Sequence, residues 1–330
     1  MDAKKALPID VLEEIEAWNL FKETAENDFK DSELRSVATE VDKKCAGLPV
    51  AIVTVARALR SKELYAWKDA LAQLQRPSPS DMQSGVPAAV YSAIELSYNN
   101  LKSEELKQTF LLCGLLGHNA RAEDLVRYGM GLRLFENVDT VEDTRNRVLT
   151  LVSNLKAFCL LRDSYSHERF DMHDFDCDVA LAIASRDNHT FALKHEGVFD
   201  DWPDEERMRK LKMISLSFDS VEKLPHQLEC PQLEFFCMGS KDSDAEIPVN
   251  FQLFLNYTLG FPSLEKVIMR QCPKMEIFSK RELSTSKLKG VQSTEGEYVG
   301  RWEGNLNATI QQLFIEKNDQ NCEEETAVSF

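Results

Sequence analysis

Phe170-Asp171-Met172-His173-Asp174 lies where two kinds of sequence pattern meet. Before it, Phe158 to Arg162 and Glu168 to Met172 have the composition of two short strands around a turn. After it, residues 174–185 have apolar side chains at helical spacing. The quoted stretch therefore marks the end of a predicted strand and the start of a predicted helix.

The residues upstream of this hairpin have helical patterns. Ser103 precedes two glutamates, which is typical of an N-cap followed by an acidic first turn. Several helices followed by a small hairpin indicate a winged-helix domain, which we place at residues 77–195. The predicted helices are Val90 to Leu101, Ser103 to Leu116, Ala122 to Phe135 and Thr140 to Leu155.

The first 76 residues predict a bundle of four short amphipathic helices. Asp31 or Ser32 is expected to cap the second helix, and Pro49 to begin the third. Arg76-Pro77-Ser78-Pro79-Ser80 is rich in turn-forming residues, and it marks the end of this bundle.

From Leu211 onward the period changes. Leu211-Lys212-Met213-Ile214-Ser215-Leu216 fits the pattern L-x-x-L-x-L, and similar spacing begins at Leu233, Leu264 and Leu288. We predict a short leucine-rich-repeat solenoid with a C-terminal cap or tail at 211–330, after a linker at 196–210. The predicted fold class is mainly α with α/β repeats.

Composition narrows the class of protein. The 55 acidic and 39 basic residues give a net charge of -16, which repels phosphate backbones and argues against nucleic acid as a partner. None of the eight cysteines forms a C-x-x-C pair, which favours reduced thiols and no metal site. No apolar run approaches the roughly 20 residues that span a bilayer, and the charged first ten residues do not suggest a secretory signal, so we predict a cytoplasmic protein.

Three separated segments resemble parts of the NB-ARC nucleotide-binding domain of plant leucine-rich-repeat disease resistance proteins of the coiled-coil type. Glu16 to Phe21 is similar to the segment after the sensor strand, and Cys45 to Ile52 to the G-L-P-L motif, with Val50 as its last residue. Phe170 to Asp174 matches the M-H-D motif. The resemblance implies a fragment of an immune receptor in which ADP holds the closed state and ATP opens it.

Gly47, Leu48, Pro49 and His173 are the candidate site residues. A glycine such as Gly47 can adopt positive φ and end a helix, while proline suits the first helical position, so these residues predict a helix–helix corner. A lone histidine where a helix begins, such as His173, is more often a cap or a packed side chain than a ligand, although a helix N-terminus and a histidine donor also suit a phosphate. The resemblance adds that Pro49 packs on the adenine and that His173 contacts the β-phosphate of ADP. Asp174 is expected to cap the following helix. Phe175-Asp176-Cys177 departs from the family's apolar pair and arginine.

The sequence contains no Gly-Lys dipeptide and hence no G-x-x-x-x-G-K-[ST] phosphate loop. We therefore expect a chain truncated at its N-terminus that is not an enzyme and binds ADP or ATP weakly or not at all. The expected partners are proteins: a pathogen effector, a guarded host protein or the missing half of the receptor. Two alternatives stay open, namely a winged-helix DNA-binding protein and an NTPase subunit completed in trans.

Overall fold

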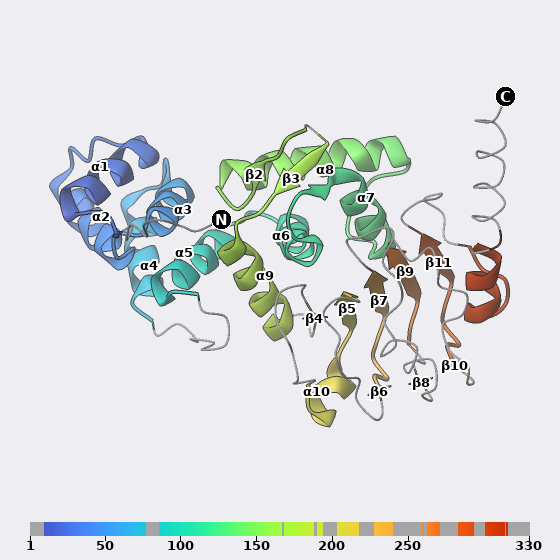
Figure 1. The fold of residues 1–330 in the computed structure, drawn as a ribbon. Coiled ribbons are helices and arrows are strands. Elements are labelled where there is room, and N and C mark those ends of the chain that lie inside the picture. Colours follow the sequence, from blue (N-terminus) through green and yellow to red (C-terminus); the bar gives the residue numbers. More distant parts are fainter. Residues whose placement is uncertain are drawn as a thin grey trace, which may run out of the picture. The chain divides into compact units, whose positions relative to one another are not determined.

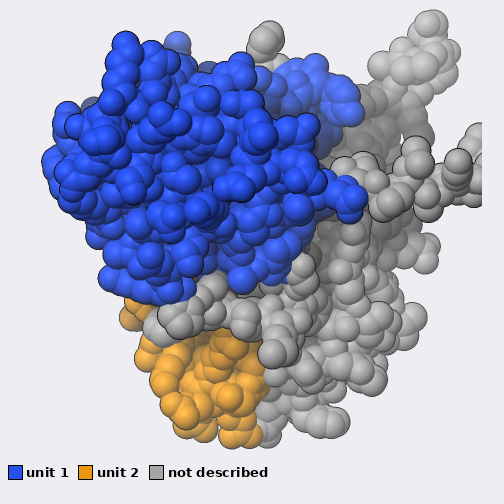
Figure 2. Space-filling view, turned by 90° about the vertical axis from the view of Figure 1, so that its left-hand side faces the viewer, with its two compact units in different colours: residues 1–126, 134–180 blue, residues 127–133, 181–330 orange. Residues whose placement is uncertain are grey.

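The computed structural model describes residues 10–76, 86–166, 168–187, 190–193, 203–217, 228–239, 259–260, 263–270, 283–293, 301–313 and 315 (Figure 1). The chain divides into two compact units, coloured in Figure 2: residues 1–126 with 134–180, and residues 127–133 with 181–330. The fold is mainly helical with small sheets. The domain boundaries predicted above remain predictions. The break at 77–80, the first part of the linker, 196–202, and much of the tail lie outside the described residues.

The first unit begins with four short helices (Figure 1). Aromatic side chains from the first helix, the loop after it and the fourth helix pack against one another. Trp67 is buried, and its ring lies 5.9 Å from that of Phe21 and 5.4 Å from that of Phe29. Asp31 caps the second helix by accepting a 2.8 Å hydrogen bond from the Leu34 N–H, which confirms one of the two predicted caps. The helices are α1 (Glu14–Ala25), α2 (Ser32–Lys44), α3 (Pro49–Leu59) and α4 (Leu64–Leu74).

The same unit continues with helices and a three-stranded antiparallel sheet of order β1-β3-β2. Ser103 caps α6 through a 3.2 Å bond from the Leu106 N–H, as predicted. The elements are α5 (Ala88–Asn99), α6 (Glu104–Leu116), β1 (Ala120–Arg121), α7 (Ala122–Gly131), α8 (Val141–Ala157), β2 (Arg162–Asp163), β3 (Arg169–Asp171) and α9 (Asp174–Asp187). Both α7 and α9 cross from the first unit into the second.

Two predicted boundaries here are wrong for the same reason. The strand predicted over Phe158 to Arg162 starts only at Arg162, because Phe158 ends α8 and Cys159 adopts a left-handed conformation with φ 57°. The helix predicted as far as Phe135 stops at Gly131, and Arg133 has φ 53°. A left-handed residue ends regular structure, and neither cysteine nor arginine announces one in a sequence. Strand β1 was not predicted.

The second unit contains a five-stranded parallel sheet of order β11-β9-β7-β5-β4 (Figure 1). Its strands are β4 (Thr190–Leu193), β5 (Met213–Ser217), β7 (Phe235–Gly239), β9 (Lys266–Arg270) and β11 (Gly290–Ser293). Two-residue strands β6 (Leu228–Glu229), β8 (Leu259–Gly260) and β10 (Leu283–Ser284) form a second parallel set, of order β10-β8-β6. Helix α10 (Glu205–Lys210) lies within the stretch predicted as a linker.

The parallel strands keep a constant register. Ile214, Phe236, Val267 and Val291 are paired neighbours across the sheet, and all four are buried. Four strands of this sheet each begin two residues after the first leucine of a predicted repeat, namely β5, β7, β9 and β11. A buried row repeated on successive parallel strands is what stacked, self-similar chain segments produce. Strand β4, which precedes the first predicted repeat, was not predicted.

Candidate functional site

The corner between α2 and α3 is formed by backbone geometry. After α2 ends, Ala46 and Gly47 take φ values of 54° and 70°, and the Leu48 N–H donates to the Cys45 carbonyl at 3.0 Å. The Gly47 carbonyl accepts a 2.9 Å bond from the Leu12 N–H. A Cβ at Gly47 would lie 2.6 Å from the Leu12 carbonyl oxygen. Glycine is therefore required twice, by its φ and by the close approach of the segment before α1.

Leu48 and Pro49 begin α3 as predicted. Leu48 is extended, with φ -82° and ψ 115°, and its carbonyl accepts the first helical bond from the Ile52 N–H at 3.0 Å. Pro49 occupies the first helical position, where a missing N–H is not needed. The Pro49 side chain is exposed while Leu48 is half-buried. An exposed, rigid ring at the start of a helix can serve as a flat apolar wall.

His173 caps α9 through its own ring. Its Nδ1 accepts a 3.2 Å hydrogen bond from the Phe175 N–H, and its carbonyl accepts from the Cys177 N–H at 2.9 Å. The expectation that Asp174 caps this helix is therefore wrong, because Asp174 is already its first residue and His173 fills the N-cap position. The imidazole also stacks on Phe175, with ring centroids 5.1 Å apart.

The cap determines the protonation state of His173. A ring nitrogen that accepts a hydrogen bond carries no hydrogen, so the neutral ring has its hydrogen on Nε2. Burial lowers the pKa of His173, and the positive charge of Arg162 lowers it further. His173 is thus held neutral, and its Nε2–H is the group that can donate to an anion.

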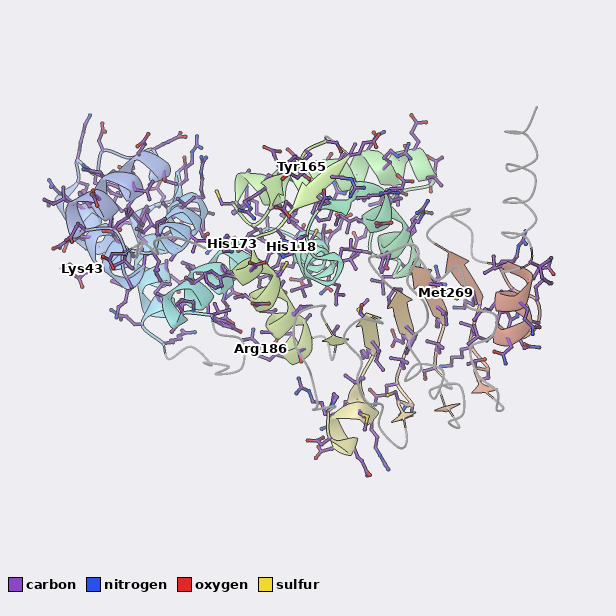
Figure 3. All side chains as sticks on the ribbon, in the orientation of Figure 1. Lys43, His118, Tyr165, His173, Arg186 and Met269 are labelled. Atoms are coloured by element: carbon purple, nitrogen blue, oxygen red, sulfur yellow. The ribbon has the colours of Figure 1, made fainter. Side chains whose placement is uncertain are left out.

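His118 lies near His173 (Figure 3). It contacts the carboxylates of Asp171 and Asp174, which stand on either side of the turn. His118 Nδ1 lies 3.4 Å from Asp171 Oδ1, and its Nε2 lies 2.7 Å from Asp174 Oδ1. Asp171, at the end of β3, also accepts a 3.1 Å bond from the Asn119 N–H and pairs with Arg162 at 3.4 Å. Burial raises the pKa of Asp171, but hydrogen bonds from the Asn119 and Met172 backbones and the charge of Arg162 outweigh burial and lower it.

Sequence reasoning missed His118 because no local pattern identifies it. It follows the apolar helix α6, far from the His173 turn along the chain, and it is brought there by the pairing of β1 with β3. That pairing joins Ala120 to Phe170. A two-residue strand such as β1 gives too short a period to be recognised in a sequence.

A buried carboxyl lies in the first turn of α9. Asp176 is buried, and its Oδ1 has no hydrogen-bond partner within the described part of the chain. Burial raises the pKa of Asp176 to about 8, against the opposing charge of Arg162. Burial also raises the pKa of the Cys159 thiol. The charge of Arg57 opposes this shift, and the charge of Asp176 adds to it.

Cys159 is thus the electrostatic neighbour of both helices that carry the candidate site. Arg57 belongs to α3, which Pro49 begins, and Asp176 belongs to α9, which His173 caps. No hydrogen bond or ion pair between described residues joins His173 directly to the Gly47–Pro49 corner. The structure therefore brings His118, Asp171, His173 and Asp174 together. The link from the corner to α9 runs through Arg57 of α3, Cys159 and Asp176.

The donors near His173 are suited to one contact with an anion rather than to a full phosphate site. Arg162 already pairs with Asp171, and His118 already contacts the carboxylates of Asp171 and Asp174. A phosphate needs several convergent donors or a helix N-terminus clear of acidic groups. What the described side chains offer here is the exposed ring of Pro49 and one directed donor, the His173 Nε2–H.

Two other functional classes find little support in the described residues. No cluster of three or more histidine, cysteine, aspartate or glutamate side chains among them has the arrangement of a metal site. No helix in that part of the chain combines the length and apolar character needed to cross a membrane.

Curated proteins similar to this chain share one description. The chain is 29% identical over 307 residues to a disease resistance protein of Arabidopsis thaliana, covering 83% of this chain and 31% of that protein. It is 26% identical over 299 residues to a "probable disease resistance protein" of the same plant, covering 83% and 32%. A third such protein is 30% identical over 226 residues, covering 66% and 25%. No family model matches the chain. The chain spans about a third of the length of the first two curated relatives.

Proposed function

Because this chain is a relative of plant disease resistance proteins, we propose that it is the regulatory and recognition part of an immune receptor of that kind, acting in the cytoplasm. In this proposal the first unit senses bound nucleotide and the second unit contacts proteins. The chain itself performs no catalysis.

The observation that carries the proposal is the N-cap made by His173. The cap holds Nδ1 as an acceptor and leaves the hydrogen on Nε2, so the ring is a directed donor at the start of α9. Such a donor suits the β-phosphate of ADP, and the exposed Pro49 ring suits the adenine. The negative β-phosphate of ADP would accept a hydrogen bond from His173. Loss of that contact would free the start of α9 to move.

We propose further that most of the affinity for ADP belongs to a phosphate loop outside this sequence. The sequence contains no Gly-Lys dipeptide, and Arg162, near His173, already pairs with Asp171. The chain alone should then bind ADP with a dissociation constant of roughly 1 mM or weaker, or about -4 kcal/mol.

Calorimetric titration of ADP tests this proposal in two stages. The chain alone should give almost no heat, and tight binding to it would contradict the proposal. In the second stage a phosphate-loop ATPase domain of a plant disease resistance receptor is added. ADP binding to the mixture should be tighter than to that domain alone.

Substitutions at His173 then separate the phosphate contact from the helix cap. His173→Asn retains a good N-cap acceptor but removes the imidazole, so it should lose the gain in ADP affinity while keeping the stability of α9. Tyr165→Ala, which changes a fully exposed side chain between β2 and β3, serves as the control and should keep the gain. An unchanged gain in His173→Asn would remove His173 from the nucleotide site.

The parallel strands of the second unit support a role in protein recognition. Their constant register and their fixed offset from each repeat leucine favour a short leucine-rich-repeat solenoid. Stacked repeats present an extended surface to protein partners. The partner classes are a pathogen effector, a guarded host protein and the receptor's own nucleotide-binding half.

The two alternatives lead to different measurements. Two cations of the helices before the hairpin already pair with glutamates, Lys107 with Glu104 at 3.0 Å and Arg145 with Glu123 at 2.9 Å. Salt-dependent binding to duplex DNA would favour a winged-helix DNA-binding protein, and we expect none. ATP hydrolysis that appears only when the phosphate-loop domain and this chain are mixed would favour an NTPase completed in trans.

A further inference from the structure

We propose that His118 is a positioning residue for His173: by bridging Asp171 and Asp174 it fixes the turn between β3 and α9 and so sets the direction of the His173 Nε2–H. The bridge is a property of the turn itself. Its importance for sensing a phosphate rests on the function proposed above.

The geometry of the bridge supports this role. Asp171 is the last residue of β3 and Asp174 is the first residue of α9, so the two carboxylates flank Met172 and His173. One imidazole contacts both carboxylates, at 3.4 Å and 2.7 Å. Met172 is buried, which fixes the other side of the turn. His173 therefore lies between two held points.

The two histidines make different contacts in this turn. Both ring nitrogens of His118 face carboxylates, those of Asp171 from β3 and Asp174 from α9, and Arg162 from β2 also faces Asp171. His173 instead accepts the Phe175 N–H at Nδ1, which requires that atom to be unprotonated. His118 therefore holds the carboxylates on either side of His173 without competing for its cap.

The anchors at the two ends differ, which makes the effect of losing His118 local. Asp171 would still be held by the Asn119 N–H and by Arg162. Asp174 is largely exposed, and His118 is the partner that joins it to the rest of the turn. Removing His118 should therefore loosen the start of α9 while β3 and the sheet stay in place.

Amide hydrogen exchange of Phe175 tests the proposal directly, because this N–H donates to the His173 ring. In His118→Ala the Phe175 amide should exchange about tenfold faster at pH 7, while amides in the later turns of α9 keep their protection. His118→Gln, whose amide can reach one carboxylate, should give an intermediate rate. Asp163→Asn is the matched control. It removes an exposed carboxylate of β2 that pairs with Lys156 of α8, and it should leave the Phe175 rate unchanged.

Unchanged Phe175 exchange in a folded His118→Ala chain would overturn the proposal. So would a uniform rise along all of α9, which indicates general destabilisation. If His118→Ala does not fold, Asp174→Ala removes the shorter contact alone and should still accelerate Phe175 exchange severalfold; an unchanged rate there would also overturn the proposal.

These measurements are made without nucleotide, so they are independent of the proposed function. Accelerated Phe175 exchange together with ADP affinity of the mixture that ignores His173→Asn would keep His118 as a positioning residue and reject the phosphate contact. Unchanged exchange together with ADP affinity that depends on His173 would reject the bridge alone.

Discussion

Two turns in the first unit each begin a helix of the candidate site, and they are built from different materials. The turn before α3 consists of Gly47, Leu48 and Pro49 and depends on backbone conformation and close packing against Leu12. The turn before α9 is held by titratable side chains, with His173 as its cap and His118 as its bridge. The first is therefore a fixed corner, and the second responds to charge.

This difference indicates how the two turns should tolerate change. The corner has no room for even one added carbon at Gly47, yet its geometry does not depend on pH. The turn before α9 leaves Asp174 and His118 partly exposed, but its conformation depends on the contacts between these side chains. A phosphate, a proton or a charge substitution should act on the second turn and leave the first unaffected.

The largest effect is expected for Gly47→Ala. The added Cβ would lie 2.6 Å from the Leu12 carbonyl oxygen, at a φ of 70°, so the variant combines a clash with a strained backbone. We expect a loss of roughly 3 kcal/mol in the free energy of unfolding, measured by urea denaturation. Gly304→Ala is the control, because it has a φ of 87° and no atom within 4 Å of the added carbon, and it should lose only about 1 kcal/mol. Equal losses would show that the close approach of Leu12 is unimportant.

The next effect concerns Asp176 and pH. The pKa of Asp176 is raised from its ordinary value of 3.8 to about 8, so the folded state binds the proton more tightly than the unfolded state. Its contribution to stability is complete below about pH 4 and is lost as the pH rises toward 8. Asp176→Asn cannot titrate, so its unfolding free energy should fall less between pH 5 and pH 6.5, by roughly 2 kcal/mol.

Asp187→Asn, at the other end of α9, is the control for this pH series. Asp187 pairs with Arg186 at 2.7 Å and is partly exposed, so the wild-type slope should persist in this variant. The same slope in Asp176→Asn would mean that another group causes the pH dependence. Gly47→Ala should shift the whole curve downward without changing its slope, which separates the two turns.

The smallest effect is expected for Pro49→Ala. Alanine is a good helix former and fits the first helical position, so the main change is a more flexible unfolded chain. The free energy of unfolding should fall by about 0.5 kcal/mol in thermal or urea unfolding. A loss above about 2 kcal/mol would show that the ring itself holds the corner, which would remove the reason for treating its exposed face as a ligand wall.

The sequence was most informative where a single residue determines local geometry. Gly47 and Pro49 predicted the corner, and Asp31 and Ser103 predicted helix caps, because each acts on backbone groups a few residues away. The start of α9 near His173 was also predicted, but the cap was assigned to Asp174 because aspartate is a commoner cap than histidine.

The parts that could not be predicted depend on contacts distant in sequence or on unfavoured backbone angles. His118 reaches the site only through the pairing of β1 with β3. In the sequence, Asp176 is a polar residue near the start of a predicted helix, and nothing there predicts that it is buried in the folded structure. Cys159 gives no sign of the left-handed angle that delays β2.

The parallel sheet of the second unit has a consequence for how such a protein changes over generations. Among the described residues, β5, β7 and β9 each pair with the strand before and the strand after them in the sheet, and the buried row continues in the same register from one strand to the next. A duplication or deletion that spans one whole repeat would therefore join strands that already match. Unequal recombination within the gene can lengthen or shorten this sheet while the residues around Gly47 and His173 remain untouched.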